Sequence, residues 1–330
     1  MKHLSIVIPK GELILDTVVG SMNLIRMANV YSKRIGRYSS DLFEIDLVAE
    51  SLDPINCHSY FNIQPTKRLK DVRRTDLIII SSITGDIESH LEKNEAMISW
   101  IKERRLKDNA EIASLCRSAF VLAETGLLNE KTCATHWAVH DKFKLKYPEI
   151  QLIPDRVISE DDGIYTSGGA YSFLNLIVYL IEKYYGRETA IWCSKMAEID
   201  YDRDNQNHFI IFNAQKDHND ELIKDVQNYI EENYEDKLTV ESITRKFAIS
   251  GRTFIRRFKK ATMNTPLEYI QRVKVEVAKK KMESSSLNIG QIMYEVGYID
   301  EKAFRKTFKR YTGLSPLEYR KKYNRELAFS

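Results

Sequence analysis

The last third of the chain contains an internal repeat, which restricts the possible fold more than any other feature. The stretches ITRKFAISGRTFIRRFKKATMNTPLEYIQR and IMYEVGYIDEKAFRKTFKRYTGLSPLEYRK each predict a short helix, a tight turn and a basic helix, followed by Thr and Pro-Leu-Glu-Tyr. Two phenylalanines stand four positions apart in each basic helix, Phe254 with Phe258 and Phe304 with Phe308. This spacing places each pair on one helix face, so we expect both pairs in a hydrophobic core.

The opposite faces of the two basic helices are strongly cationic. The first carries Arg252, Arg256, Arg257, Lys259 and Lys260, and the second carries Lys302, Arg305, Lys306, Lys309 and Arg310. Two helices joined by a tight turn, with the second basic on its outer face, form the helix-turn-helix that enters the DNA major groove. A basic helical bundle with a solvated surface explains one such helix equally well, but the repeated pair favours DNA binding.

A long helix is predicted between the two helix-turn-helix units, from Pro266 to Ser284, with Pro at its first position. At a rise of about 1.5 Å per residue, its length is about 28 Å. Successive major-groove faces on one side of B-DNA lie roughly 34 Å apart. One chain would therefore reach two adjacent grooves, with flanking Lys and Arg side chains on the phosphates.

Charge is divided unequally along the chain. The net charge of the 330 residues is +3, but residues 237–325 alone hold 22 Lys and Arg against 8 Asp and Glu. The rest of the chain holds the remaining 28 basic and 39 acidic residues. A basic block of this size predicts that a polyanion is the partner of this part of the chain.

Residues 239–323 resemble the DNA-binding domain of the AraC/XylS family. The resemblance rests on IGQIMYEVGYIDEKAFRKTFKRYTGLSPLEYRKKY, with its Gly-Tyr turn, Phe-x-x-x-Phe-Lys helix, Gly-Leu-Ser-Pro and closing Tyr-Arg. It implies a transcription regulator with two helix-turn-helix units. By position, the residues facing the grooves are Gly251, Arg252, Ile255, Arg256, Glu301, Lys302, Arg305 and Lys306.

The first recognition helix would rely on two arginines. Arg252 and Arg256 lie one turn apart, and each can contact guanine O6 and N7. Gly251 and Ile255 supply few hydrogen-bond donors, so the arginines should carry most of the specificity of this helix. In the second recognition helix, Glu301 either accepts from cytosine N4 or caps its own helix.

The first 200 residues alternate between short runs rich in β-branched residues and helical patterns. Buried strands are predicted over 4–9, 43–49, 75–82 and 110–115, helices over 16–32, 90–107, 118–128, 137–147 and 170–185, and a hairpin over 151–158 and 163–167. The alternation predicts an α/β domain of flavodoxin type, with helices on both faces of a parallel sheet. An all-α domain with two helix-turn-helix units follows it.

Cys116 lies in ASLCRSAF, where a predicted strand meets a helix beginning near Ser118. Such a junction exposes the side chain at the carboxyl edge of the sheet, and the helix N-terminus would lower the thiol pKa. His136 follows 20 residues later, and Asp16 lies just after the first strand. Three roles of Cys116 stay open at this point, namely chemical turnover, the lining of an effector pocket and structural burial.

Residues 3–190 resemble the class I glutamine-amidotransferase-like superfamily, in the branch with cysteine peptidase and amidase members. The resemblance rests on the strand and Lys-Gly at the start, SLCRSAFVLAETGLL, THWAVHDKFKLKYP and YTSGGAYSFLNLIVYLIEKYYG. It implies a nucleophile at Cys116, a nearby histidine at His136 and a thiolate partner at Asp16.

Three departures from the family pattern weaken the case for catalysis. Arg117 and Ser118 replace the small residues that follow the family's cysteine, and Asp16 is shorter than the usual Glu. In addition, no acidic residue close in the sequence is placed to orient His136. We therefore expect no catalytic residues, but a degenerate sensor and dimerisation domain in which Cys116, His136 and Asp16 line an effector pocket or are vestigial.

The predicted boundaries are 1–199 for the sensor domain, 200–220 for a linker and 221–330 for the DNA-binding domain. The linker is polar and acidic apart from the island Phe209–Phe212, which is predicted to dock as a strand rather than to act as a binding motif. Four scattered cysteines without a CxxC argue against disulfides and a zinc site, and no metal or cofactor is expected. Lys10 and Glu12 interrupt the early apolar run, so no secretory signal is expected. The longest apolar helix candidate, Phe173–Ile181, is too short to span a bilayer, and the scattered cysteines favour the reducing cytoplasm.

The preferred interpretation is a transcription regulator, more an activator than a repressor, controlled by a small nitrogen-containing effector. Its expected partners are double-stranded promoter DNA, that effector, a second copy of the chain and, for an activator, RNA polymerase. Two alternatives use Cys116, namely a cysteine hydrolase or aldehyde-processing enzyme and a thiol redox sensor.

Overall fold

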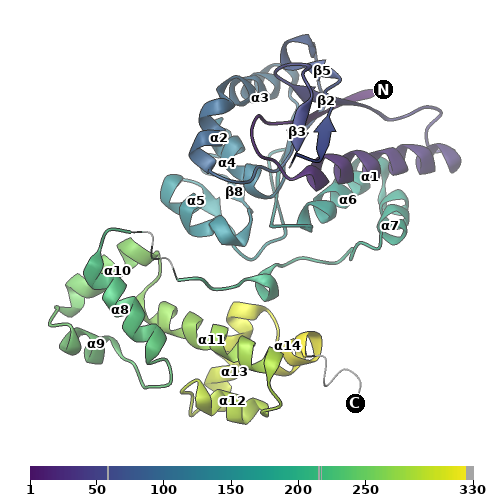
Figure 1. Ribbon diagram of the computed structural model, residues 1–330. Coiled ribbons are helices and arrows are strands. Elements are labelled where there is room, and N and C mark those ends of the chain that lie inside the picture. Colours follow the sequence, from purple (N-terminus) through teal and green to yellow (C-terminus); the bar gives the residue numbers. More distant parts are fainter. Residues whose placement is uncertain (58, 215, 217, 325–330) are drawn as a thin grey trace. The chain divides into compact units, whose positions relative to one another are not determined.

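The computed structural model describes residues 1–57, 59–214, 216 and 218–324. The chain divides into two compact units, the first ending at Gln206 and the second beginning at Asn207. Figure 1 shows a first unit of strands and helices and a second unit of helices. The predicted fold class is thereby confirmed.

A mostly parallel sheet forms the centre of the first unit. Its strands are β1 (Lys2–Val7), β2 (Phe43–Ala49), β5 (Lys67–Arg68), β6 (Leu77–Ile80), β7 (Glu111–Ser114), β10 (Ile158–Asp161) and β11 (Ile164–Ser167). Within the described residues they lie in the order β10-β11-β7-β6-β1-β2-β5. Only the edge strand β10 is antiparallel to its neighbour.

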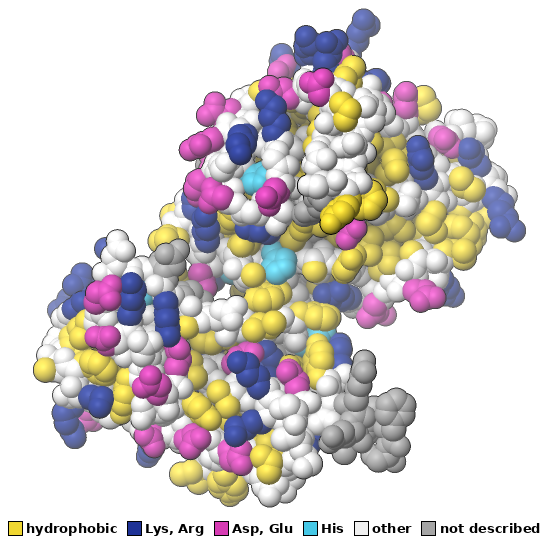
Figure 2. All heavy atoms as spheres, in the orientation of Figure 1, with side chains coloured by type: hydrophobic (Ala, Val, Ile, Leu, Met, Phe, Trp, Pro, Cys, Tyr) yellow, Lys and Arg dark blue, Asp and Glu magenta, His cyan; other side chains and the backbone are white. Residues whose placement is uncertain are grey.

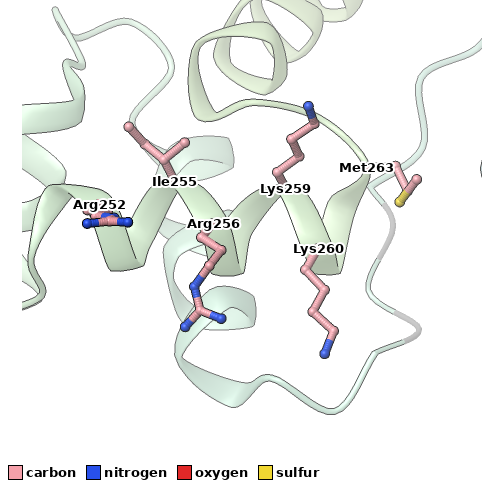
Figure 3. Close-up of a pocket in the computed structure, with 6 residues that line it drawn as sticks. All are labelled: Arg252, Ile255, Arg256, Lys259, Lys260 and Met263. Carbon is pink, nitrogen blue, oxygen red and sulfur yellow. The ribbon is translucent and has the colours of Figure 1, made fainter.

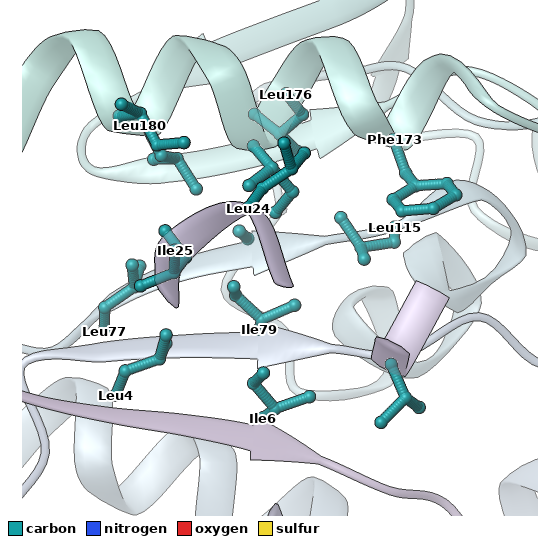
Figure 4. Close-up of a cluster of buried hydrophobic side chains, with 14 of the residues drawn as sticks. Leu4, Ile6, Leu24, Ile25, Leu77, Ile79, Leu115, Phe173, Leu176 and Leu180 are labelled. Carbon is teal, nitrogen blue, oxygen red and sulfur yellow. The ribbon is translucent and has the colours of Figure 1, made fainter. Parts of the chain in front are cut away.

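Side chains of the central strands alternate between the two faces of the sheet. Leu77 and Ile79 pack into one core with Leu4 and Ile6, where α1 (Leu15–Arg34), α6 (Ser172–Tyr185) and α7 (Arg187–Met196) contribute the opposing side chains (Figure 4). Ile78 and Ile80 pack into the other core, beneath α2 (Ile87–Lys93), α3 (Glu95–Asp108), α4 (Ala119–Glu124) and α5 (His140–Lys146). Both faces are covered, which explains why β6 is apolar at every position.

Several boundaries differ from the predicted ones. The helix predicted over 90–107 is two helices, α2 and α3, because the chain breaks at Asn94, whose buried side chain hydrogen-bonds both backbone groups of Lys10. The predicted strand over 151–158 is wrong as one strand, since β9 (Gln151–Leu152) pairs with β8 (Thr132–Cys133) and the hairpin consists of β10 and β11. Prediction also missed α7 and the small hairpin of β3 (Ile55–Cys57) and β4 (Phe61–Ile63).

The second unit consists of α8 (Glu221–Glu232), α9 (Val240–Lys246), α10 (Gly251–Thr262), α11 (Pro266–Ser284), α12 (Ile289–Glu295), α13 (Glu301–Thr312) and α14 (Pro316–Tyr323). The long helix α11 has the bounds that the sequence predicted. The side chains of Thr239, Ser250, Thr265, Asn288, Asp300 and Ser315 each accept from a backbone N–H in the first turn of the helix that follows. Such caps stabilise a helix by about 1 kcal/mol each, which is why the polar residue sets the boundary.

Each helix-turn-helix unit has a core of its own. Phe254 and Phe258 pack with Tyr269 in the first, and Phe304 and Phe308 pack with Tyr319 in the second. All four phenylalanines are 0% exposed, as their spacing predicted. Figure 1 shows α11 running from the group α8–α10 to the group α12–α14.

The apolar island Phe209–Phe212 does dock, but the prediction that it is a strand is wrong. Residues 207–209 form the short 3₁₀ helix η4 (Asn207–Phe209), and residues 210–212 have no regular structure. Side chains of α11 take the place of a partner strand, because Glu276 accepts from the backbone N–H of Phe212 and Lys279 donates to the carbonyl of Ile210.

Candidate DNA interface and cysteine elbow

The first recognition helix, α10, presents exposed side chains along its outer face. Figure 3 shows Ile255 and Lys259 on one side of the helix and Arg256 and Lys260 on the other. Together with Arg252 and Met263 they line an open hollow of about 690 Å³. Arginine donors and an aliphatic surface thus stand next to one another on the face that would enter a groove.

Gly251 begins α10 and leaves open space at the helix N-terminus. A Cβ atom built there would meet no atom within 4 Å. A nucleic-acid backbone can therefore approach the first turn of this helix closely. The first turn contains no acidic side chain, so the partial positive charge of the helix N-terminus is not neutralised from within the helix.

Arg257 does not belong to this face, contrary to the sequence analysis. Its guanidinium binds both carboxylate oxygens of Asp220, with Nε–Oδ2 and Nη2–Oδ1 distances of 2.9 and 2.5 Å. Asp220 also caps α8 by accepting from the backbone N–H of Ile223. The hydrogen bond from Arg257 holds the pKa of Asp220 below its ordinary value. Arg257 therefore joins α10 to α8 instead of contacting DNA.

The second recognition helix, α13, has a different outer face. Lys302 and Lys306 are exposed, whereas Arg305 forms an ion pair one turn along the helix with Glu301, at 2.5 Å. Glu301 is not the cap that was considered, because Asp300 accepts from the first backbone N–H groups of α13. The Glu301 carboxylate instead orients the Arg305 guanidinium along the helix surface.

A buried lysine fixes α11 between the two helix-turn-helix units. The Lys274 side chain donates to the carbonyl of Asp236, which follows α8, and to the carbonyl of Gly297 in the second turn, both at 3.2 Å. Burial lowers the pKa of Lys274. Because the two carbonyls belong to different helix-turn-helix units, this contact restricts how these two helix-turn-helix units can move about the long helix.

The face of the molecule in Figure 2 shows basic and acidic side chains interspersed on both units. No single cationic patch marks a DNA site in this view. The predicted site is defined instead by the outer faces of α10 and α13. Their contacts with bases stay predictions, and the experiments below test them.

The chain turns sharply at Cys116, at the end of β7. Its φ is +59°, in the left-handed region that costs a non-glycine residue roughly 1–3 kcal/mol. Ser118 fits into this turn because its hydroxyl lies in the interior, where it donates to backbone carbonyls of Ile80 and Leu115 and accepts from the N–H of Leu115. The strained backbone of a nucleophile elbow is thus present although Ser118 is not a small apolar residue.

The thiol itself does not have the predicted properties. Cys116 is only 1% exposed, and burial raises its pKa above the ordinary value. Hydrogen bonds from the Ser82 hydroxyl and from the backbone N–H groups of Ala170 and Arg117 oppose this increase without outweighing it. The expectation of an exposed side chain with a lowered pKa is therefore wrong, because desolvation exceeds the effect of the helix N-terminus.

His136 lies against the glycine loop that follows β11. A Cβ atom on Gly169 would fall 2.5 Å from the His136 ring, so only glycine permits this packing. The ring Nδ1 accepts from the backbone N–H of Ala138 at 3.0 Å. Burial and the nearby Arg117 charge lower the pKa of His136, which keeps the ring neutral at pH 7.

The side chains of Asp16 and Arg117 have hydrogen-bond partners other than the thiol. Asp16 is exposed, and its carboxylate accepts from the Tyr171 hydroxyl at 3.0 Å. Arg117 donates to the carbonyl of Gly85, and its buried Nε has no hydrogen-bond partner. The hydrogen bonds to the thiol come from the Ser82 hydroxyl and from the backbone N–H groups of Ala170 and Arg117, not from Asp16.

Two contributors to the elbow were missed by sequence reasoning. Ser82 follows β6, and Ala170 has a φ of +48° that aims its N–H at the thiol. Side chains at the carboxyl ends of neighbouring parallel strands meet at one edge, so the position of Ser82 after an apolar run was a usable signal. The conformation of Ala170 had no sequence signal, because alanine rarely adopts a positive φ.

The described residues contain no group of three or more His, Cys, Asp or Glu side chains arranged to hold a metal ion. Within the same residues, no helix has the length and apolar character required to cross a membrane.

Two family models match the chain. A model described as a helix-turn-helix domain matches residues 243–322, and the DJ-1/PfpI family model matches residues 30–183. Together they cover the repeat with its long helix and most of the α/β unit.

Two curated relatives align with nearly the whole chain, and a third aligns with less than half of it. The HTH-type transcriptional regulator GbdR of Pseudomonas aeruginosa is 20% identical over 316 residues, covering 94% of this chain and 83% of the relative. CdhR of the same organism, also an HTH-type transcriptional regulator, is 21% identical over 305 residues, covering 92% and 87%. An isonitrile hydratase of Pseudomonas putida is 28% identical over 149 residues, covering 44% of this chain and 62% of the enzyme.

Solved structures support the fold. A protein from Vibrio parahaemolyticus described as a transcriptional regulator has a TM-score of 0.52 at 24% identity, covering 59% of this chain and 98% of the other. A ThiJ/PfpI family protein from Pseudomonas syringae has a TM-score of 0.51 at 19% identity, covering 64% and 78%.

Proposed function

We propose that a small metabolite bound beside the Cys116 elbow controls how the two helix-turn-helix units bind promoter DNA. This proposal proceeds from the family, because the chain is an AraC-type transcriptional regulator whose first domain is of the DJ-1/PfpI type. The observation that carries the DNA part is the presence of exposed basic faces on α10 and α13 in units joined by one 19-residue helix. The domain boundaries that go with this proposal are 1–199 for the sensor domain, 200–220 for the linker and 221–330 for the DNA-binding domain.

Base contacts are assigned to Gly251, Arg252, Ile255, Arg256, Glu301, Lys302, Arg305 and Lys306. Arg252→Ala should cost about 1–3 kcal/mol at one base position and relax specificity there, as expected for loss of a bidentate contact. Lys260→Ala should weaken binding to all sequences alike and reduce the salt dependence. Fluorescence anisotropy with a duplex selected from a random library measures both effects.

Arg245→Ala is the matched control for these variants. Arg245 is a basic side chain that is 79% exposed, but it lies on α9 and pairs with Glu241 instead of standing on a recognition helix. Its loss should leave sequence preference unchanged. A loss of specificity in Arg245→Ala equal to that in Arg252→Ala would contradict the assigned face.

The effector site is supported by polar groups that lack partners. The buried Nε of Arg117 and the buried hydroxyl of Ser172, next to the glycine loop, have none. Such groups cost free energy unless a ligand or water satisfies them, so the effector should carry an acceptor such as a carboxylate. The exposed carboxylate of Asp16 suits a nitrogen cation on the same small molecule.

The effector can be sought by thermal unfolding of the full chain with a panel of small nitrogen-containing metabolites. A ligand at 100 times its Kd stabilises the folded state by about 2.7 kcal/mol. Arg117→Met should remove this stabilisation, whereas Arg105→Met, at a half-buried arginine on α3 that donates to the carbonyls of Ala110 and Asp162, should retain it. A panel ligand that stabilises wild type and Arg117→Met equally would place the effector elsewhere.

We propose that the elbow binds and does not turn over its ligand. A buried, protonated thiol is a weak nucleophile, and a histidine whose Nδ1 is occupied by a backbone N–H lacks an orienting carboxylate there. The relative that is an isonitrile hydratase favours one enzymatic alternative, hydration of an isonitrile. Turnover of an isonitrile that disappears in Cys116→Ala would establish that alternative and refute the binding role.

The raised thiol pKa also bears on the redox-sensor alternative. Sensor cysteines are exposed thiolates, so Cys116 should react slowly with hydrogen peroxide at neutral pH. Rapid formation of a sulfenic acid at Cys116, detected by mass spectrometry, would reverse this assignment.

The regulator is proposed to act in the cytoplasm as a homodimer formed by the first domain, and as an activator that contacts RNA polymerase. Sedimentation of the full chain tests the dimer, and transcription in vitro with purified polymerase tests activation. A monomer at micromolar concentration would refute the proposed dimer, and repression of the selected promoter would refute the proposed activation.

A further inference from the structure

Two neighbouring segments of the chain are anchored in different compact units. Gln206 ends the first unit and Asn207 begins the second, and Asn207 alone separates the anchor at Gln206 from the anchor that begins at His208. Consecutive Cα atoms are about 3.8 Å apart across a trans peptide, so the two peptide bonds between the anchors leave little slack. The segment predicted as a linker is therefore held on both sides of Asn207.

The anchor in the first unit is the side chain of Gln206, which is 1% exposed. Its amide nitrogen donates to the carbonyls of Thr135, Pro154 and Arg156 at 3.1–3.2 Å, and its amide oxygen accepts from the N–H of Gly169 at 3.0 Å. A buried amide with every polar atom satisfied holds its position firmly.

This anchor is part of the surroundings of Cys116. The loop at Gly168 and Gly169 lies between Gln206 and His136, since Cβ atoms there would fall 2.9 Å from the amide of Gln206 and 2.5 Å from the His136 ring. The next residue, Ala170, donates its N–H to the Cys116 thiol. A ligand that displaces this loop must therefore disturb the hydrogen bonds and packing that hold the Gln206 side chain.

The anchor in the second unit is a strap, defined here as His208–Phe212. At one end, Lys322 donates to His208 at 2.9 Å and the Tyr323 hydroxyl donates to the His208 carbonyl, both from α14 of the second helix-turn-helix unit. At the other end, Phe212 packs edge-to-face on Tyr269 of the first core, with ring centroids 5.3 Å apart.

The middle of the strap is fixed to α11. Lys279, whose side chain is 5% exposed, pairs with Glu276 at 2.8 Å and donates to the carbonyl of Ile210 at 2.6 Å. Glu276 in turn accepts from the N–H of Phe212. The strap thus contacts both helix-turn-helix units and the helix between them, so it positions the two recognition helices relative to each other.

From these contacts we infer that Gln206 and the strap His208–Phe212 form a taut connector that couples the loop beside Cys116 to the arrangement of the two helix-turn-helix units. The inference rests on the proposed effector site, and it names the route by which that site acts. Motion of the glycine loop moves Gln206, and the short link through Asn207 passes that motion to the strap. Coupling between two sites is reciprocal, so DNA binding must also change the opening of the elbow.

The reciprocal effect can be measured without an effector. In the full chain, the alkylation rate of buried Cys116 by iodoacetamide reports how often the elbow opens. We expect a saturating duplex, selected from a random library, to change this rate by about fivefold or more. Cys193, a buried cysteine on α7, serves as the internal control and should keep its rate.

An insertion distinguishes the connector from ordinary structural support. Placing Gly-Gly between Gln206 and Asn207 adds slack but removes no contact of either anchor. We expect it to bring the rates with and without duplex to within about twofold of each other, while the duplex still binds. The same insertion between Tyr201 and Asp202, before both anchors, should leave the effect of the duplex unchanged.

Gln206→Ala is a second variant, and it removes the hydrogen bonds of the Gln206 amide that form the first anchor. It should make Cys116 react quickly both with and without duplex. The inference is overturned if the duplex does not change the wild-type rate, if the effect survives the insertion after Gln206, or if both insertions abolish it. Because no metabolite is present, failure of the proposed effector and failure of the connector give separate results.

Discussion

The second residue of the turn differs between the two helix-turn-helix units, and this difference affects the stability of each unit. Gly297 has a φ of +72°, and a Cβ there would fall 2.1 Å from the carbonyl oxygen of Glu235. The corresponding position in the first unit is Ala248, which has a φ of +48° and is exposed. The same left-handed turn is thus made by glycine in one copy and by a strained alanine in the other.

This difference predicts opposite effects of reciprocal substitutions. Gly297→Ala should lower the free energy of unfolding by about 2 kcal/mol or more, because it adds both strain and a clash with the backbone. Ala248→Gly should raise it by up to about 1 kcal/mol. Chemical denaturation of the full chain, following the helical signal, measures both.

Gly251→Ala is the control for the glycine substitution. Its Cβ would meet nothing, and alanine favours a helix by about 0.5–1 kcal/mol over glycine, so this variant should be slightly more stable. If Gly297→Ala were as stable as Gly251→Ala, the turn would not require glycine.

Ile255 makes a second prediction at the residue scale. Its side chain is 42% exposed between Arg252 and Arg256, where an aliphatic group suits the methyl group of thymine. Replacing the contacted thymine by deoxyuridine should weaken wild-type binding several-fold, within the roughly 1–3 kcal/mol typical of a base contact, and should leave Ile255→Ala unaffected. Equal losses for both proteins at every thymine of the selected duplex would show that Ile255 contacts no methyl group.

At the scale of elements, the pair Asp220–Arg257 joins α8 to α10 and makes the first helix-turn-helix unit sensitive to acid. The hydrogen bond from Arg257 keeps the folded-state pKa of Asp220 below the ordinary value of an aspartate. Its stabilisation is therefore present above the unfolded pKa, and it is lost as the pH falls from there through the lower folded pKa. Thermal unfolding between pH 7 and pH 3 should show this loss in the wild type.

Asp220→Asn separates the charge from the cap. Asparagine caps helices as well as aspartate does, so this variant should keep α8 but lose the part of the pH dependence that comes from the ion pair. An unchanged acid profile in Asp220→Asn would mean that other carboxylates cause the effect.

At the scale of the whole molecule, one rigid helix sets the distance between the two DNA-reading faces. Lys274 holds α11 to both units, and the strap crosses it on another side. Binding should therefore require two half-sites about one turn, or roughly 10 base pairs, apart. Adding about 5 or about 10 base pairs between them should reduce the affinity to that of a single half-site, because α11 cannot lengthen.

Competition with duplexes of varied spacing measures this requirement. A pair of flexibly joined units would recover affinity when a full turn of about 10 base pairs is added. Recovery at that spacing would contradict a rigid α11.

Sequence reasoning succeeded where local chemistry decides the structure. Thr265 with Pro266 started α11 at the predicted residue, and the paired phenylalanines were core residues, because caps and helical spacing act within a few residues. It failed for Arg257, whose partner Asp220 is 37 residues away in the sequence. It also failed for the Cys116 pKa, since the burial that raises it comes from several elements.

The amino-acid sequence by itself therefore determined the α/β and helical classes, the bounds of α11 and the strand-to-helix junction at Cys116, because these follow from periodicity and capping. Only the tertiary structure decided that Arg257 faces inward, that the thiol is buried and that Gln206 and the strap are anchored in separate units. Each of these depends on which distant segments pack together, and burial and hydrogen bonding between such segments have no local signal.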